Sequence, residues 1–409
     1  MKTYDLIVVG GGFAGCAAAI SAARAGASVL LLEKSNALGG AAVNSLVHPF
    51  MPNATRVNGQ MLALSQGIFQ EICAQLPGGK LHDETLKLLL NRMVLGAGAE
   101  ILFHAAVIDA ARRENRLERV TVFAQGRRYA FAARLFIDAT GDANLTAMAG
   151  FPFRVGRAQD GLCQPMTLCF RVANIDMAQF EQDRAAMQTA YAKGLSEGRF
   201  RNPREDILYF ETCADGVLHF NTTRVVRCDP TDLFDLTRAE IEAREQVAEL
   251  FDFLKNGFAA FRHSVLLATA AEIGIRESRM IDGAYLLTGA DLVACTRFPD
   301  AIAAGNYDID IHNPEGSGTS HYYFPAGQFY TIPYRCLIPD GSENLLAAGR
   351  CISVDHEAQA SIRIMPIVCC LGEATGTASA LALRENVPVY AVDIPALQKV
   401  LLENGAFLG

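Results

Sequence analysis

The sequence predicts an α/β fold in which helices cover a parallel central sheet, with a mainly antiparallel domain inserted into the chain. Three observations support this prediction. Two short runs rich in Val, Ile and Leu, typical of buried parallel strands, lie at residues 4–9 and 28–33. A glycine-rich turn and an Ala-rich helical stretch separate these runs. The same strand pattern returns near the C-terminus, at residues 344–350, after a long stretch of different character.

The first 150 residues contain the elements of one domain in order. Residues 4–33 predict a βαβ unit, because the Ala-rich residues 13–25 favour a helix and Gly26 provides its C-terminal cap. Amphipathic patterns then predict two further helices, and apolar runs predict three strands. The expected helices lie at residues 60–75 and 82–95, and the expected strands at 100–109, 117–123 and 129–138.

The pattern changes after residue 150. We expect residues 151–334 to form a separate, mostly antiparallel domain. Its expected elements are strands at 166–172 and 216–221, a helix at 237–261 and a loop rich in Gly, Asn and Pro at 308–319. Residues 335–409 are expected to rejoin residues 1–150 in the first domain, through the late strand and an apolar helix at 365–383.

Composition and charge exclude several classes of protein. The chain has 409 residues, of which 51% are hydrophobic and 20% charged, a globular composition with room for two or three domains. The net charge of −8 argues against binding to nucleic acids or anionic membranes. The stretch 6–32 is apolar, but three consecutive glycines and Arg24 within it favour strand, turn, helix and strand over a membrane span.

The 11 cysteines are spread along the chain without a Cys-x-x-Cys pair. This spacing provides neither a disulfide framework nor a metal site, so we expect reduced thiols and no metal. The sequence therefore predicts a cytoplasmic protein that acts on a small molecule and binds neither nucleic acid nor membrane. A homo-oligomer and a complex with a redox partner both remain open.

The segment Gly10-Gly11-Gly12-Phe13-Ala14-Gly15 fits the pattern G-x-G-x-x-G between a strand and a helix. The first glycine makes the tight turn, the second lets a pyrophosphate approach the backbone, and the third lets helix and strand pack closely. Glu33 ends the second strand, where a carboxylate accepts hydrogen bonds from an adenosine ribose. Together these features predict a Rossmann-type, dinucleotide-binding domain.

Three further segments distinguish FAD from NAD as the dinucleotide. They are Leu38-Gly39-Gly40, the strand end at 137–142 and the late segment at 347–350 with the helix after it. At these residues the sequence resembles the FAD-dependent oxidoreductases with a glutathione-reductase-type FAD-binding domain. The motif and the resemblance imply cofactor contacts from Gly10, Gly12, Phe13, Ala14, Gly15, Glu33, Lys34, Gly39, Gly40, Val107, Ala139, Thr140, Gly141, Asp142, Gly349, Arg350, Ile362 and Arg363.

A narrower resemblance covers residues 274–288, 310–314, 332–335 and 349–363, which look like a bacterial subfamily of these proteins. Many members of that subfamily have no assigned substrate, so this likeness implies the cofactor rather than the reaction. Residues 10–16 also resemble the flavin subunit of a tRNA-uridine modification enzyme. We do not favour that function, because the chain is acidic and has no obvious RNA-binding region.

No second complete G-x-G-x-x-G follows a strand, so the sequence predicts no built-in nicotinamide-binding domain. The expected function is an FAD-dependent oxidoreductase that transfers hydride between flavin N5 and a small polar organic substrate, either neutral or anionic. The alternative is an FAD-binding electron-transfer subunit that acts with a redox partner.

Two candidate catalytic residues straddle the start of the late helix, beside the expected flavin ring. His356 suits general acid–base chemistry, although a structural hydrogen bond is the alternative. Arg363 could stabilise negative charge on reduced flavin or hold a substrate carboxylate. The inserted domain and the domain junction supply four more candidates, each with a structural alternative: Arg276, His312, Tyr334 and Arg335.

Overall fold

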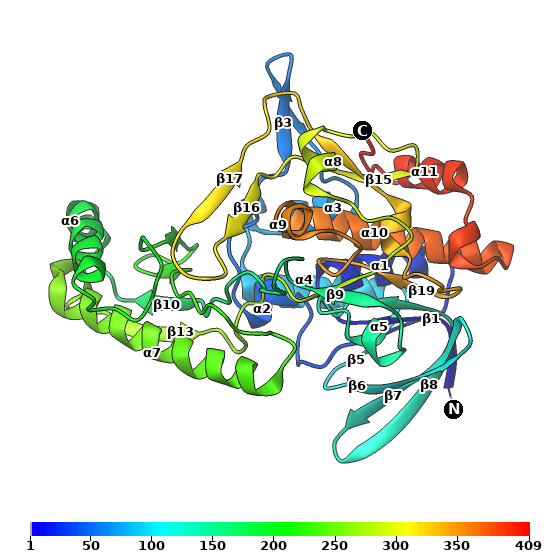
Figure 1. Ribbon diagram of the computed structural model, residues 1–409, viewed down its shortest axis with the longest axis horizontal. Coiled ribbons are helices and arrows are strands. Elements are labelled where there is room, and N and C mark those ends of the chain that lie inside the picture. Colours follow the sequence, from blue (N-terminus) through cyan, green and yellow to red (C-terminus); the bar gives the residue numbers. More distant parts are fainter. Residues whose placement is uncertain (1) are drawn as a thin grey trace.

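The computed structural model describes residues 2–409 (Figure 1). Its central sheet consists of β1 (Lys2–Val9), β2 (Val29–Leu32), β5 (Glu100–Leu102), β6 (Ala106–Arg113), β7 (Arg116–Ala124), β8 (Arg127–Asp138) and β19 (Leu345–Ala347). The order is β5-β2-β1-β8-β7-β6, and β19 also pairs with β8. Strands β5, β2, β1, β8 and β19 are parallel, whereas β7 pairs antiparallel with β8 and β6 pairs antiparallel with β7. The predicted α/β fold with a parallel core is confirmed.

Strand β1 is buried on both faces of this sheet. Leu6 and Val8 belong to the hydrophobic cluster that contains α1 (Phe13–Arg24) and α10 (Met365–Glu385). Ile7 and Val9 belong to a second cluster, formed with β6, β7 and α5 (Asn144–Met148). Burial on both sides explains why the strand is a continuous apolar run rather than an alternating one.

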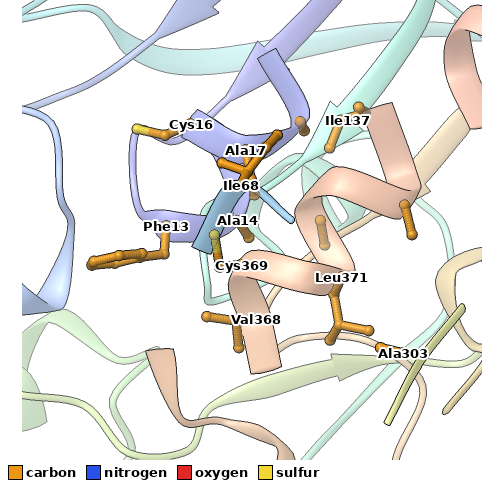
Figure 2. Close-up of a cluster of buried hydrophobic side chains, with 14 of the residues drawn as sticks. Phe13, Ala14, Cys16, Ala17, Ile68, Ile137, Ala303, Val368, Cys369 and Leu371 are labelled. Atoms are coloured by element: carbon orange, nitrogen blue, oxygen red, sulfur yellow. The ribbon is translucent and has the colours of Figure 1, made fainter. Parts of the chain in front are cut away.

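Helices α1 and α10 pack against each other at very short range. Figure 2 shows apolar side chains of both helices gathered together, with Ala14 of α1 close to Cys369 of α10. A Cβ atom at Gly372 would overlap the carbonyl oxygen of Ala14. Helix α10 is long and apolar enough to cross a membrane, but 83% of its most apolar window is buried in the protein, as expected of a core helix.

The predicted helix at 60–75 is wrong in its first half. Residues 60–63 form β4 (Gln60–Ala63), which pairs with β3 (Ala54–Val57), and α3 (Ile68–Gln75) begins only after Gly67. Gly67 has a φ of 61°, a left-handed conformation that interrupts the chain direction. The helix at 82–95 is confirmed as α4 (Asp83–Gly96), and the first domain also holds α2 (Ala41–Asn44) and η1 (Pro77–Gly79).

The inserted segment contains a four-stranded antiparallel sheet of order β11-β12-β10-β13. Its strands are β10 (Phe170–Ala173), β11 (Tyr209–Glu211), β12 (Leu218–Phe220) and β13 (Val265–Thr269). One face of this sheet packs under α6 (Met177–Ser196), α7 (Leu233–Gly257) and η2 (Ala259–Phe261), with Phe170 stacked on Phe220. The opposite face carries Arg171 and His219 and turns toward the first domain, where Arg171 pairs with Asp83 of α4.

Three two-stranded sheets complete this part of the chain: β9 (Phe153–Val155) with β14 (Arg279–Ile281), β15 (Ala301–Gly305) with β18 (Tyr330–Pro333), and β16 (Ile309–His312) with β17 (Thr319–Tyr322). The predicted loop at 308–319 is wrong in its first part, where residues 309–312 form β16, but residues 313–318 are the turn that joins β16 to β17 in a hairpin. Ile302, Ile332 and Leu337 belong to the same hydrophobic cluster as α1 and α10. The hydrophobic core therefore continues across residue 334, the expected end of the inserted domain.

The remaining helical elements are short or lie at the C-terminus. They are α8 (Gly289–Val293), η3 (Tyr334–Leu337), α9 (His356–Ile362), η4 (Val389–Ala391) and α11 (Ile394–Glu403). Helix α11 packs against α10 on the outside of the first domain (Figure 1).

The contact between α1 and α10 predicts a large effect of Gly372→Ala. The added methyl group would overlap the Ala14 carbonyl, which belongs to rigid helix backbone, and overpacking of this kind costs about 1–3 kcal/mol or more. Urea unfolding of the apoprotein would measure the loss. The control is Gly96→Ala at the end of α4, where a Cβ meets no atom within 4 Å and stability should change little. Equal unfolding midpoints for the two variants would contradict the predicted packing.

Glu373 predicts a pH dependence of stability. Burial raises the pKa of this carboxyl from its ordinary value of 4.5 to about 7, although it accepts a hydrogen bond from the Ile68 amide. The folded protein therefore binds the proton more tightly than the unfolded chain, so this contribution is complete below pH 4.5 and is lost as the pH rises through 7.

Between those limits the wild type should lose about 2–3 kcal/mol relative to Glu373→Gln. Urea unfolding of both proteins at about pH 5 and about pH 8 would measure the difference. Parallel pH profiles for the two proteins would show that Glu373 does not titrate in this range.

Candidate functional site

A cavity of about 260 Å³ lies at the carboxyl ends of the parallel strands, where α1 and α10 begin. Sixteen of the residues predicted to bind the cofactor line it: Gly10, Gly12, Phe13, Ala14, Glu33, Lys34, Gly39, Gly40, Val107, Ala139, Thr140, Gly141, Asp142, Gly349, Arg350 and Arg363. Gly15 and Ile362 are fully covered by protein and lie outside this lining.

The glycine-rich turn leaves room for a ligand at one position and none at another. A Cβ at Gly12 would meet only the Cα of Gly40, 3.8 Å away, and would project into the cavity. A Cβ at Gly15 would overlap the carbonyl oxygen of Gly10, so Gly15 serves close packing of helix and strand. No side chain caps the first turn of α1, whose free N–H groups suit a phosphate.

Glu33 is buried at the end of β2 and lines the same cavity. Its Oε2 accepts the Gly11 N–H at 2.6 Å, and its Oε1 accepts the Ser35 N–H at 2.7 Å. A carboxylate can accept about four hydrogen bonds, so each oxygen keeps a lone pair for a ribose hydroxyl. The residues present thus fit the adenosine portion of a dinucleotide.

Arg350 and Asp142 join two walls of the cavity. The Arg350 guanidinium contacts Asp142 Oδ1 at 2.5 Å, and Ser278 donates to the same oxygen at 2.6 Å. Burial alone would raise the pKa of Asp142, but Arg350 holds it below its ordinary value. Because this pair is neutral overall, Asp142 does not repel an anionic pyrophosphate. Lys34, also in the lining, pairs with Glu272 at 3.1 Å.

Sequence reasoning missed the lining residues that come from three short segments. They are Ala41, Ala42, Asn44 and Ser45 on or beside α2, Asn144, Leu145 and Met148 on α5, and Glu272, Ile273 and Ile275 before β14. The first group follows Gly39-Gly40 directly, so its position along the dinucleotide could have been inferred. The third group has no local signal, because only the tertiary fold brings it to the first domain.

Arg363 is the predicted catalytic residue that lines the cavity. It follows α9 as its C-cap, and its Nη2 donates to the Asp310 carbonyl at 3.2 Å and to Gln164 Oε1 at 3.4 Å. Its Nε is buried and has no partner among residues 2–409. Arg363 thus connects the cavity with the inserted segment.

His356 does not line the cavity. It is the first residue of α9, is 6% exposed, and shares a hydrogen bond of 2.9 Å with Glu277 Oε1. The other oxygen of Glu277 accepts the Gln164 N–H at 2.8 Å. His356 thus forms the kind of buried hydrogen bond that the sequence offered as the alternative.

Tyr334 and Arg335 are also placed away from the cavity. Tyr334 is buried in the core, and its hydroxyl donates to the Val389 carbonyl at 2.8 Å. The guanidinium of Arg335 contacts Asp300 at 3.1 Å and lies over the Tyr285 ring. Neither residue lines the cavity, because the junction around η3 is filled by core packing.

His312 lies in strand β16 rather than in a loop, close to Arg363. Its Nδ1 lies 3.1 Å from Arg224 Nη2, so this nitrogen accepts and the proton sits on Nε2, 3.4 Å from Asp310 Oδ2. Burial and the Arg276 charge lower the pKa of His312 well below its usual range, so the ring is neutral at pH 7. Arg276 lies outside the cavity lining and donates to Pro165 O and Thr167 Oγ1.

Substitution by alanine should have opposite effects at Gly12 and Gly15. Gly12→Ala should leave apoprotein stability within about 1 kcal/mol, because the methyl group enters the cavity rather than the core. It should weaken FAD binding at least about tenfold, since the methyl takes the space of a phosphate. Gly15→Ala should mainly destabilise the apoprotein. Urea unfolding and FAD titration would separate the two effects, and a reversed pattern would contradict the assignment.

Two solved structures resemble this chain at low sequence identity. The structure resembles a geranylgeranyl bacteriochlorophyll reductase-like protein from Thermoplasma acidophilum (11% identity, TM-score 0.47), with 99% of this chain and 85% of that chain covered. It also resembles p-nitrophenol 4-monooxygenase from Pseudomonas putida (13% identity, TM-score 0.49), with 99% and 87% covered.

The sequence comparison is more direct. The model of the FAD dependent oxidoreductase family matches residues 5–401, nearly the whole chain. The cavity, its glycine-rich turn and Glu33 fit the cofactor of that family. The chain belongs to the FAD-dependent oxidoreductase family.

Proposed function

We propose that this flavoprotein transfers a hydride between FAD and a small polar organic substrate that binds between the cavity and the inserted antiparallel sheet. The observation that carries the proposal is the position of Arg363. This residue lines the cavity, hydrogen-bonds to the inserted segment, and keeps a buried Nε–H without a partner among residues 2–409. An unpaired donor in such a place favours a polar ligand.

We infer that FAD lies extended through the cavity, as in glutathione-reductase-type domains. Glu33 would hold the adenosine ribose, and the free N–H groups of α1 would face the pyrophosphate. The cavity is also lined by Arg363, Met365 and Val368, where α10 begins without a side-chain cap, and we take this as its opposite end. The flavin ring would lie at that end, next to the inserted segment.

FAD, when bound, supplies the hydride chemistry, so the task of the protein is to bind and orient the substrate. Arg363 can hold an oxygen of the substrate or offset negative charge at the flavin end. Asp310 is nine-tenths buried and its Oδ1 has no hydrogen-bond partner within residues 2–409, with His321 Nδ1 3.8 Å away, so it can accept a hydrogen bond from a substrate O–H or N–H. Its pKa lies well below the ordinary value despite burial, because His312 and Arg363 stabilise the charged form.

An anaerobic reduction experiment tests the proposal. The purified protein should show a flavin absorption spectrum that bleaches when one class of small polar donor is added, such as hydroxy acids, amines or sugars. Arg363→Met should retain FAD but slow this reduction about 10- to 100-fold, the cost of losing a charge-assisted donor of about 1.5–3 kcal/mol. Arg335→Met, whose guanidinium pairs with Asp300 away from the cavity, is the matched control.

Two outcomes would contradict the proposal. A flavin that no small donor reduces, but that a protein partner does, would favour an electron-transfer subunit. Equal reduction rates for Arg363→Met and the wild type would remove Arg363 from the substrate site.

A further inference from the structure

Polar atoms without partners gather where the inserted sheet faces the first domain. Because β10 and β12 pair Arg171 with His219, these side chains share the face opposite the Phe170–Phe220 stack. The buried atoms without a partner in the described chain include, in this region, Arg171 Nε, Arg204 Nη1, both ring nitrogens of His219, Asn221 Oδ1, Asp310 Oδ1 and Arg363 Nε. Each such atom costs about 1–3 kcal/mol, so this concentration indicates a place built for a polar ligand.

The arginines of this region differ in one respect. Four of them contact a carboxylate: Arg171 with Asp83 (2.7 Å), Arg204 with Asp206 (2.9 Å), Arg224 with Glu205 (3.0 Å) and Arg363 with Asp310 (3.6 Å). Arg276 contacts none within 4 Å among residues 2–409, and its Nη1 donates only to the neutral oxygens Pro165 O and Thr167 Oγ1, at 2.7 and 2.6 Å. Arg276 is therefore the arginine whose charge the fold leaves unbalanced.

The free edge of the Arg276 guanidinium has a defined geometry. Nε and Nη2 form no hydrogen bond within residues 2–409, and neither atom is fully buried. These two groups present parallel N–H bonds, which match the two oxygens of a carboxylate. The backbone is fixed as well, because the Arg276 carbonyl accepts a hydrogen bond of 2.6 Å from Gln359 of α9.

The electrostatics of Arg276 favour an anion. Burial and the neighbouring charge of Arg363 lower the pKa of Arg276 to about 9, so it stays protonated at pH 7 against an unfavourable local potential. Asp310 cannot balance it alone, since Arg363 lies 3.6 Å from its Oδ2 and the His312 ring nitrogen 3.4 Å from the same oxygen. A bound anion would relieve the repulsion between Arg276 and Arg363.

We propose that Arg276 binds the carboxylate of the substrate, through the Nε–Nη2 edge, and that the substrate is therefore an organic acid. This inference rests on the proposed function, because it identifies the ligand of the same site. Arg363 then lies between this subsite and the flavin end of the cavity, and Asp310 Oδ1 offers an acceptor for a hydroxyl or amino group of the same molecule.

Carboxylate titration of the FAD-loaded protein tests the inference without turnover. Acetate, malonate and succinate are added in turn, and the flavin difference spectrum is recorded, with acetamide as the uncharged match for acetate. The wild type should give a saturable change with at least one carboxylate and none with acetamide. Arg276→Met should weaken that binding at least about tenfold. Arg276→Lys should weaken it less, because lysine keeps the positive charge but lacks the two parallel N–H donors of the guanidinium. Arg335→Met should bind as the wild type does.

Each other result decides against the inference. Unchanged carboxylate affinity in Arg276→Met, with an altered flavin spectrum or redox potential, would mean that Arg276 acts on the flavin. If Arg276→Met fails to retain FAD, a wild type that binds acetamide as well as acetate, or an Arg276→Lys variant with wild-type carboxylate affinity, would contradict the inference. If no carboxylate changes the flavin spectrum but neutral donors reduce the flavin, this inference alone is overturned. If no small donor of any class reduces the flavin, the proposed function is overturned too.

Discussion

The contact between α1 and α10 is the constraint on which the cofactor cavity depends. These helices lie more than 340 residues apart in the chain, yet their backbones approach so closely that side chains at Gly372 and Gly376 would overlap the carbonyls of Ala14 and Ala18. A buried hydrogen bond of 2.7 Å between Ser21 and Thr377 fixes their relative position further along. This packing aims the uncapped first turns of both helices at one cavity. The two ends of the chain therefore have to assemble before a dinucleotide site exists.

The inserted segment supplies what the parallel core lacks. The core offers glycine-rich backbone, small side chains, the Glu33 carboxylate and the Arg350–Asp142 pair, which suit a cofactor but provide little chemistry of their own. The antiparallel sheet and the β16–β17 hairpin carry buried charges, and most of these charges neutralise each other in pairs. Arg276 has no carboxylate partner, and the Nε–H of Arg363 has no acceptor within residues 2–409. These two groups remain available to a ligand.

Sequence reasoning succeeded where the signal is local. The βαβ unit, its glycine-rich turn, Glu33 and helix α4 follow from short-range periodicity and from steric demands on single residues. It was wrong where a single residue reverses the chain direction. Gly67, with a φ of 61°, separates a hairpin strand from α3, and His104, with a φ of 54°, divides the predicted strand at 100–109 into β5 and β6.

The candidate catalytic residues were harder to predict, because their roles depend on partners distant in sequence. His356 binds Glu277, and Tyr334 binds the carbonyl of Val389; each pair is more than 50 residues apart and is formed only by tertiary packing. A histidine or tyrosine near a motif has no local mark that separates a buried structural bond from a free catalytic group. Arg363 could be predicted because it lies shortly after the late FAD-binding segment at 347–350 in the sequence.

The central claim is that one cavity holds FAD extended from Glu33 to Arg363, and ligand titration of the apoprotein tests it most directly. FAD and FMN are titrated separately, with flavin fluorescence as the readout, and ADP is added as a competitor. The account predicts one FAD per chain, displacement by ADP, and FMN binding at least about a hundredfold weaker, since FMN cannot occupy the adenosine end. Equal affinity for FMN and FAD, or FAD binding that ADP does not affect, would contradict it.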